Sequence, residues 1–270
     1  MHKQNLHTHS VFCDGKNTIE EMTQRAIELG FDSLGFSGHI YKDYAICSMS
    51  EENINAYKQE IRRVKEKYKD KIKIYLGAEY DMFADQDRSE YDYVIGSVHC
   101  IEMDGEIVDM DVSATEVKEL IQNRFHGDGL ALAKAYYKTM ARLSEFGQFD
   151  FVGHFDLVNK HCEKQGIFDD DCKEYKDAAL EALHTVAKTH KVFEVNVGAI
   201  ARGYKTAPYP APFLLKEMKA LGCGVLISSD CHKKEFLDAN FDLGTQYIQS
   251  CGFDEILIFD GKEFVGQKIK

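Results

Sequence analysis

The chain has 270 residues, 44% of them hydrophobic, and a formal net charge of −12. Such a chain can bury a sizeable core, and only 3 prolines and no low-complexity stretch interrupt it. The negative charge disfavours nucleic acid and anionic membranes as partners, but it does not exclude a small anion bound through metal ions. We therefore expect a single domain over residues 1–270.

The N-terminus and the cysteines favour a cytoplasmic protein. Residues 1–5 are polar and contain no apolar signal segment, and no run in the chain approaches the length of a membrane span. The 8 cysteines form no CxxC pair and are irregularly spaced, which is typical of reduced thiols. The sequence does not predict an oligomeric state.

Strand-like and helix-like segments alternate along the chain. The first half predicts a strand at 5–10, a helix at 18–29 with a capping box at its start, a strand at 31–40, a helix at 50–69, and strands at 71–80 and 91–99. The second half predicts a hairpin near 104–105, one or two helices over 115–146, a strand at 149–155, a helix at 170–190, a strand at 192–197, a helix at 211–221, a strand at 225–229, a helix at 237–251 and a strand at 255–259. Seven or eight strands separated by helices favour a parallel sheet, and periodicity alone leaves a closed barrel and an open sheet equally open.

Histidines and acidic residues recur where the predicted strands end. Eight side chains from six strands follow this rule: His7, His9, His39, Glu79, His99, His154, Asp230 and His232. In a parallel barrel the carboxyl ends of the strands open onto one face, so these side chains would converge there. A single histidine after a strand is usually a loop or core residue, but six of the 11 histidines share this placement. The others (His2, His126, His161, His184 and His190) do not, and we interpret them as surface or structural residues, except that the Gly-rich surroundings of His126 could form a lid.

Two of the motifs place ligand-type residues two positions apart. Residues i and i+2 of a strand point to the same side, so His7 and His9 can bind one ion together, and Asp230 and His232 can face one site. Cys100 and Cys231 stand next to ligand-type residues and are expected to point away. Imidazole and carboxylate ligands together suit Zn, Mn or Fe.

The motifs resemble, in their order along the chain, those of the polymerase and histidinol phosphatase (PHP) superfamily. They are His7-Thr8-His9-Ser10, Gly38-His39, Gly77-Ala78-Glu79-Tyr80-Asp81, Gly96-Ser97-Val98-His99, Gly153-His154-Phe155-Asp156 and Ser229-Asp230-Cys231-His232. Members of this superfamily have a distorted (β/α)7 barrel around up to three metal ions. The resemblance therefore implies an α/β chain folded as one PHP-type barrel.

Within the superfamily, the chain most resembles the monofunctional histidinol-phosphate phosphatases. The resemblance rests on Glu194-Val195-Asn196-Val197-Gly198-Ala199, Arg202 and Tyr209-Pro210. It implies hydrolysis of L-histidinol phosphate to L-histidinol and phosphate, a step of histidine biosynthesis. Related phosphatases often carry an arginine shortly after Gly-His-x-Asp, where this chain offers Lys160 instead.

The resemblance also implies roles for individual residues. It implies two or three divalent ions: one held by His7, His9, Glu79 and Asp230, a second by Glu79, His99 and His154, and a third by His39, His232 and Asp14. A hydroxide bridging the first two ions would attack phosphorus, and a proton for the departing alkoxide would come from near Asp230 and His232. The expected substrate contacts are Arg202, Asn196, Lys160 and Tyr209, with Arg202 also counted as catalytic.

Two alternatives remain open. The chain could be another PHP phosphoesterase, either a phosphotyrosine phosphatase or a nuclease-like enzyme, or it could be a non-catalytic metal-binding domain. The net charge disfavours nucleic acid, and the basic run Arg62–Lys67 is interpreted as an exposed helix face whose positive charge is reduced by nearby acidic residues. Because every expected ligand position is filled, an inactive relative is the weaker reading. We expect a small phosphorylated substrate as the partner, with no nucleic acid and no membrane.

Overall fold

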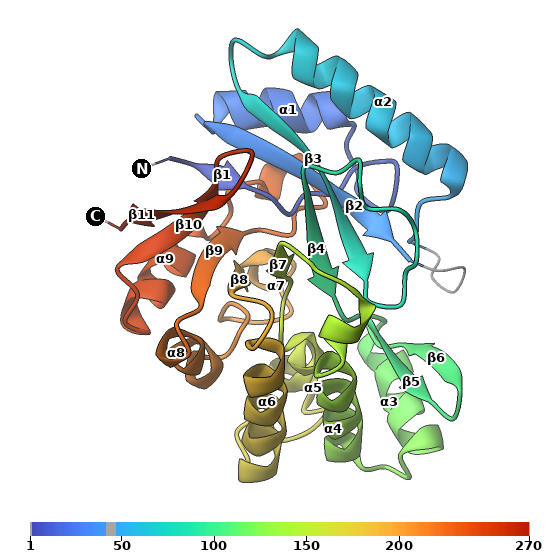
Figure 1. The fold of residues 1–270 in the computed structure, drawn as a ribbon. Helices are drawn as coiled ribbons and strands as arrows, with labels where there is room; N and C mark the ends of the chain where they lie inside the picture. The colour runs from blue at the N-terminus through green and yellow to red at the C-terminus, as the bar shows by residue number, and fades with distance from the viewer. Residues whose placement is uncertain (1, 42–46, 270) are drawn as a thin grey trace.

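Seven parallel strands form the central sheet in the order β1, β2, β3, β4, β7, β8 and β9 (Figure 1). The computed structural model describes residues 2–41 and 47–269. The strand bounds are β1 Gln4–Asn5, β2 Ser33–Ile40, β3 Lys73–Asp81, β4 Tyr93–Ser97, β7 Phe151–Val152, β8 Val192–Asn196 and β9 Gly224–Ser228. The predicted parallel sheet is thus confirmed.

The first and last strands of this sheet meet just beyond their carboxyl ends. Thr8 and Cys231 form a parallel bridge, in which the backbone N–H of His9 donates to the carbonyl of Cys231 at 2.9 Å. The N–H of Cys231 in turn donates to the carbonyl of His7 at 3.0 Å. These bonds nearly close the sheet into a barrel, and they bring the segment after β1 against the segment after β9.

Helices cover the outside of the barrel. Figure 1 shows α1 (Ile19–Glu28) and α2 (Glu51–Lys67) side by side along β2 and β3. The predicted capping box is present: the side chain of Thr18 accepts from the N–H of Glu21, whose carboxylate accepts from the N–H of Thr18. The remaining helices are α3 Ala114–Arg124, α4 Gly129–Met140, α5 Cys162–Gln165, α6 Lys173–Val186, α7 Gly198–Ala201, α8 Pro212–Ala220 and α9 Phe241–Ser250, with 3-10 turns at Leu143–Phe146, Leu157–Asn159 and Lys234–Phe236.

Two hairpins lie outside the barrel sheet. The predicted hairpin is β5 (Cys100–Met103) with β6 (Glu106–Asp109), on the side toward which the arrowheads of β3 and β4 point in Figure 1. The other is β10 (Glu255–Phe259) with β11 (Phe264–Lys268). The sequence predicted β10 in the series of alternating strands, but it pairs antiparallel with β11, which the sequence did not predict.

Large apolar side chains fill the barrel interior away from the carboxyl ends of the strands. The rings of Tyr75, Tyr93 and Phe151 are buried there with that of Phe259 from β10. Phe259 lies 5.1 Å from Tyr75 and 5.8 Å from Tyr93, ring centre to ring centre. The β10–β11 hairpin therefore closes the amino end of the barrel, which leaves its carboxyl end for polar side chains.

Three further predictions can be compared with the described residues. The strand predicted at 149–155 is shorter, because only Phe151–Val152 pair as a strand. The helix predicted at 237–251 begins at Phe241. All eight cysteines are free thiols, as expected, and no helix in ranges 2–41 and 47–269 is long and apolar enough to cross a bilayer.

Candidate metal centre

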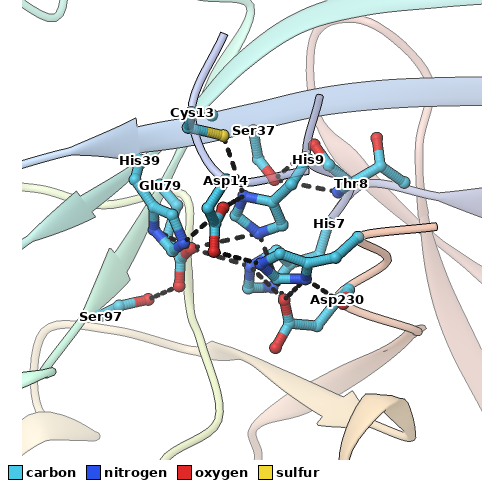
Figure 2. Close-up of polar contacts among 12 residues, drawn as sticks. His7, Thr8, His9, Cys13, Asp14, Ser37, His39, Glu79, Ser97 and Asp230 are labelled. Atoms are coloured by element: carbon cyan, nitrogen blue, oxygen red, sulfur yellow. Dashed lines mark hydrogen bonds and ion pairs between the residues drawn. The ribbon is translucent and has the colours of Figure 1, made fainter. Parts of the chain in front are cut away.

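The eight side chains predicted to converge do meet at the carboxyl end of the barrel, together with Asp14 from the loop after β1. Their donor atoms form four overlapping groups, each with all atoms within 4.8 Å of one another. The groups are His9, Asp14, His39 and His232; His7, His9 and Asp230; His7, Glu79 and His154; and His39, Glu79 and His99. Figure 2 shows six of these donors, with their side chains pointing toward a common centre: His7, His9, Asp14, His39, Glu79 and Asp230.

Glu79 lies at the middle of the cluster, and its two oxygens face different histidines. Oε2 is 3.1 Å from Nε2 of His7, 3.5 Å from Nε2 of His9 and 2.9 Å from Nδ1 of His39. The side chain is only 1% exposed. A carboxylate in this position can act as a ligand together with the histidines on either side of it.

The other oxygen of Glu79 has its own partners. Oε1 is 3.2 Å from Nε2 of His99 and 2.9 Å from Nε2 of His154. The hydroxyl of Ser97, at the end of β4, donates to the same Oε1 at 2.8 Å and fixes the plane of the carboxylate. The strand register explains the approach, because β3 and β4 are hydrogen-bonded neighbours at this level.

Asp14 reaches the cluster through a tightly folded loop. Its Oδ2 lies 3.1 Å from Nε2 of His232, and its Oδ1 lies 3.5 Å from Nε2 of His39. A Cβ on Gly15 would lie 2.5 Å from the backbone nitrogen of Ser10, so only glycine lets the loop turn back here. The N–H of Lys16 donates to the carbonyl of His232 at 2.8 Å, which holds the loop against the segment after β9.

Several of these donor atoms are buried and lack a hydrogen-bond partner among the described residues. They include Nε2 of His7 and His9, Nδ1 of His39, Oε2 of Glu79 and Oδ1 of Asp14. Unpaired buried polar atoms are costly, and here they face one another rather than scatter through the core. This arrangement of nitrogen and oxygen donors fits divalent transition-metal ions.

The electrostatics favour ligand-competent carboxylates. Burial raises the pKa of Glu79, but His7, His39 and His99 outweigh it and hold that pKa well below its usual value. Burial also opposes ionisation of Asp230, and Arg202 with His7 overcomes it. Burial and the neighbouring His232 and His39 lower the pKa of His9 to about 3, so its ring is neutral.

Other histidines respond to the carboxylates in the opposite direction. Burial lowers the pKa of His39 and of His99, but Glu79 outweighs it and raises both to about 10. A metal ligand must be a neutral imidazole, so divalent ions would displace protons from these rings.

Glu194 is a functional residue that sequence reasoning missed. It belongs to the motif Glu194-Val195-Asn196-Val197-Gly198-Ala199, but it lies inside β8 rather than at a strand end. Its fully buried carboxylate accepts from Nδ1 of His7 at 2.6 Å, from the N–H of His154 at 2.8 Å, from the amide of Asn196 at 3.0 Å, and from the hydroxyl of Ser228. With Nδ1 engaged, Nε2 of His7 is turned toward the cluster. A buried acid in the middle of a strand was the only signal that could have identified it.

Arg202 lies at the edge of the cluster. Its Nη2 donates to Oδ2 of Asp230 at 2.8 Å, and its Nη1 lies 3.2 Å from Nδ1 of His232. Its Nε is buried without a hydrogen-bond partner among the described residues. The guanidinium is thus an ion-pair partner inside the site and not on the outer surface.

The other predicted substrate contacts differ in their placement. Lys160 lines the cavity above the cluster and pairs with Asp111 at 2.6 Å. Asn196 is fully buried behind Asp230. Its side-chain NH2 group donates to Glu194, and its side-chain Oδ1 accepts from the backbone N–H of Gly198 at 2.9 Å. Tyr209 is 1% exposed, with its ring beneath Nζ of Lys205 at 5.1 Å.

The cluster opens into a cavity of about 600 Å3. Donors such as Asp14, Glu79 and His99 line one part of it, together with Arg202. A cavity of this size can hold a small organic phosphate next to the donors.

A parallel barrel with buried His, Asp and Glu donors at its carboxyl end is the architecture of a metal-dependent hydrolase. Residues 5–198 match the PHP domain, and the chain belongs to this family of metal-dependent phosphoesterases. The family and the PHP-type barrel expected from the motifs are therefore confirmed.

The similarity extends over nearly the whole chain. The chain is 26% identical to the probable histidinol-phosphatase of Schizosaccharomyces pombe, covering 94% of this chain and 88% of that protein. It is also 26% identical to the histidinol-phosphatase of Lactococcus lactis, covering 97% and 96%. The crystal structure of the Lactococcus lactis histidinol phosphate phosphatase, complexed with Zn, L-histidinol and phosphate, superposes with a TM-score of 0.75 at 23% identity over 98% of this chain and 99% of that chain.

Proposed function

We propose that this chain is a histidinol-phosphatase that hydrolyses L-histidinol phosphate to L-histidinol and phosphate. The observation that carries the proposal is the buried donor cluster, with Arg202 at its edge, opening into one cavity. The two relatives named histidinol-phosphatase, and the solved relative that contains Zn, L-histidinol and phosphate, support the choice of substrate.

The proposed cofactors are two or three divalent ions, Zn, Mn or Fe. We assign the first to His7, His9, Glu79 and Asp230, the second to Glu79, His99 and His154, and the third to His39, His232 and Asp14. The unpaired buried atoms support this assignment, and the proximity of His9 to Asp14 makes His9 a further candidate for the third ion. When bound, such ions activate water for attack on phosphorus and offset charge on the phosphate oxygens.

Arg202 is the proposed phosphate-binding residue. One of its amino groups is engaged by Asp230, which holds the planar guanidinium in place at the edge of the cavity. Arginine can meet two phosphate oxygens in one plane. Lys160 would contribute a second positive charge at the same cavity.

The proton for the leaving alcohol is proposed to pass near Asp230 and His232. Since the pKa of Asp230 is held well below its usual value, its carboxylate stays ionised and accepts rather than donates. His232 lines the same cavity, with its Nδ1 3.5 Å from Oδ1 of Asp230. Because His232 is assigned to the third ion as a neutral ligand, the donor would be a water held by this pair. Asn196 and Tyr209, which are both buried, would hold the part of the site around Asp230 in position.

A phosphate-release assay over a panel of phosphomonoesters tests the proposal, with metal content measured on the same sample. We expect kcat/KM to be highest for L-histidinol phosphate. A preference for phosphotyrosine, or for a nucleotide end, would assign the chain to another activity of the family.

A further inference from the structure

Part of the cavity lining lies outside the donor cluster and gathers around one residue. Nζ of Lys160 lies 2.6 Å from Oδ1 of Asp111 and 4.7 Å from the centre of the Tyr204 ring. The backbone N–H of Lys160 donates to the carbonyl of Leu157 at 2.9 Å. We call these four residues the Lys160 wall: Asp111, Leu157, Lys160 and Tyr204. The wall combines a carboxylate, an ammonium, an aliphatic surface and an aromatic ring, a mixture suited to an organic leaving group.

Asp111 differs from the other acids that line the cavity. Asp14, Glu79 and Asp230 belong to the donor cluster, and Asp111 is the remaining acid among the described lining residues. No role in metal binding or in phosphate binding falls to it, because a carboxylate repels phosphate. Lys160 is its one ion-pair partner among the described residues, and it engages a single oxygen of the carboxylate.

The position of Asp111 is fixed by the backbone around it. Its N–H donates to Oδ1 of Asp109, at the end of β6, at 2.8 Å. Nε2 of His161 donates to the carbonyl of Val112 at 3.0 Å, and this bond ties the segment after the hairpin to the turn that carries Lys160. The carboxylate is therefore held over the cavity by the hairpin.

The carboxylate has capacity beyond its ion pair. Lys160 engages Oδ1, and within residues 2–41 and 47–269 no hydrogen bond engages Oδ2. The side chain is 32% exposed, whereas that of Lys160 is 13% exposed. Burial raises the pKa of Asp111, but Lys160 and His99 outweigh it and lower the pKa, so the carboxylate is ionised.

We propose that Asp111 selects phosphate esters whose leaving alcohol carries a protonated amine, with Oδ2 accepting from the ammonium. The inference rests on the proposed phosphatase function and assigns recognition of the substrate's amine to Asp111. L-histidinol phosphate has an amine on the carbon next to the ester-bearing carbon, so its positive group lies close to the phosphate. Leu157 and Tyr204 offer their apolar faces to the rest of the leaving group.

Two matched pairs of esters test the proposal in the metal-loaded enzyme. One pair is L-histidinol phosphate and its analogue without the amine, and the other is phosphoethanolamine and ethyl phosphate. We expect the wild-type enzyme to prefer the aminated member of at least one pair, in kcat/KM, by about 10- to 100-fold, and Asp111→Asn to reduce that ratio to near one. Glu106→Gln removes an equal charge from an exposed position of the same hairpin and should keep the wild-type ratio.

The outcomes separate this inference from the proposed function. An equal loss for both members of a pair in Asp111→Asn would overturn the inference, because Asp111 would then only hold Lys160. A wild-type ratio near one in both pairs would overturn it as well. If the aminated esters are preferred but L-histidinol phosphate is a poor substrate beside other esters, only the proposed substrate fails. Metal content and melting temperature of each variant show whether the fold and the centre are intact.

Discussion

Glu79 places one oxygen toward His7, His9 and His39 and the other toward His99 and His154. A single carboxylate thus connects the donors of two proposed ions. Glu79→Gln keeps the size of the side chain but removes its charge, so we expect a loss of at least two metal equivalents and of nearly all turnover. Elemental analysis and phosphate release measure the two losses.

His184→Ala is the matched control for Glu79. His184 lies on α6 and pairs with Glu217 at the surface at 2.7 Å, remote from any strand end. We expect this variant to retain metal and turnover. Similar losses in the two variants would remove the basis of the site assignment.

Glu194 acts on the cluster through other residues. Its carboxylate fixes Nδ1 of His7 and the backbone N–H of His154, and an amide in its place would bring an NH2 group against one of these donors. We expect Glu194→Gln to weaken metal binding by about 10- to 100-fold. Titration of the apo-protein with Zn measures the affinity directly. Asp150→Asn, which alters a carboxylate bound to the N–H of Val94 at the amino end of the barrel, should keep wild-type affinity.

Substitution of Arg202 distinguishes phosphate binding from metal binding. Arg202→Ala should keep full metal content, because the guanidinium contacts Asp230 and His232 without being a metal ligand. It should lower kcat/KM for L-histidinol phosphate by about 10- to 1000-fold, or roughly 1.4–4 kcal/mol of transition-state binding, and Arg202→Lys should recover part of the loss. Steady-state kinetics on metal-analysed samples test this, and wild-type kinetics in Arg202→Ala would contradict it.

The sequence predicted the convergence of the donors because they follow successive strand ends, and topology brings such positions together. It could not reveal Glu194, since a residue inside a strand shows its role only through contacts with His7 and His154. Nor could it reveal the pairing of Lys160 with Asp111, because the two residues come together only when the β5–β6 hairpin folds over the cavity. The roles assigned to the predicted site residues stay predictions.

At the scale of elements, the barrel depends on close packing between strands β3 and β4. A Cβ on Gly77 would lie 2.2 Å from the ring of Tyr93, which fills the interior below the donors. Gly77→Ala should therefore destabilise the fold by about 1–3 kcal/mol through overpacking. Urea unfolding measures the change.

A glycine substitution in open space provides the comparison for Gly77→Ala. Gly105, in the β5–β6 turn at φ 81°, has no neighbour within 4 Å of a Cβ, and asparagine tolerates this conformation. Gly105→Asn should change stability little. If Gly77→Ala is equally harmless, the interior is less tightly packed than the distances indicate.

Most elements were predictable because their periodicity and caps are local properties. The capping box of α1 and the β5–β6 turn appear where the sequence placed them. The antiparallel pairing of β10 with β11 was not predictable, because an apolar strand near the chain end has the same sequence pattern whether it extends the sheet or closes the barrel. In the structure, Phe259 packs on Tyr75 inside the barrel, so the β10–β11 hairpin closes the barrel and does not extend the sheet.

The whole molecule carries a net charge of −12, while its proposed substrate is an anion. The donor cluster contributes three carboxylates, Asp14, Glu79 and Asp230, so two or three divalent ions would leave the site positive in an otherwise acidic protein. Substrate attraction should then depend on the ions rather than on the protein surface.

The central claim is that this cluster is a catalytic metal centre. The direct measurement is phosphate release from L-histidinol phosphate by one preparation before chelation, after prolonged chelation, and after return of Zn, Mn or Fe, with metal content determined at each stage. We predict that activity falls with the metal and returns with at least one of these ions. Full activity in a sample shown by elemental analysis to lack metal would contradict it.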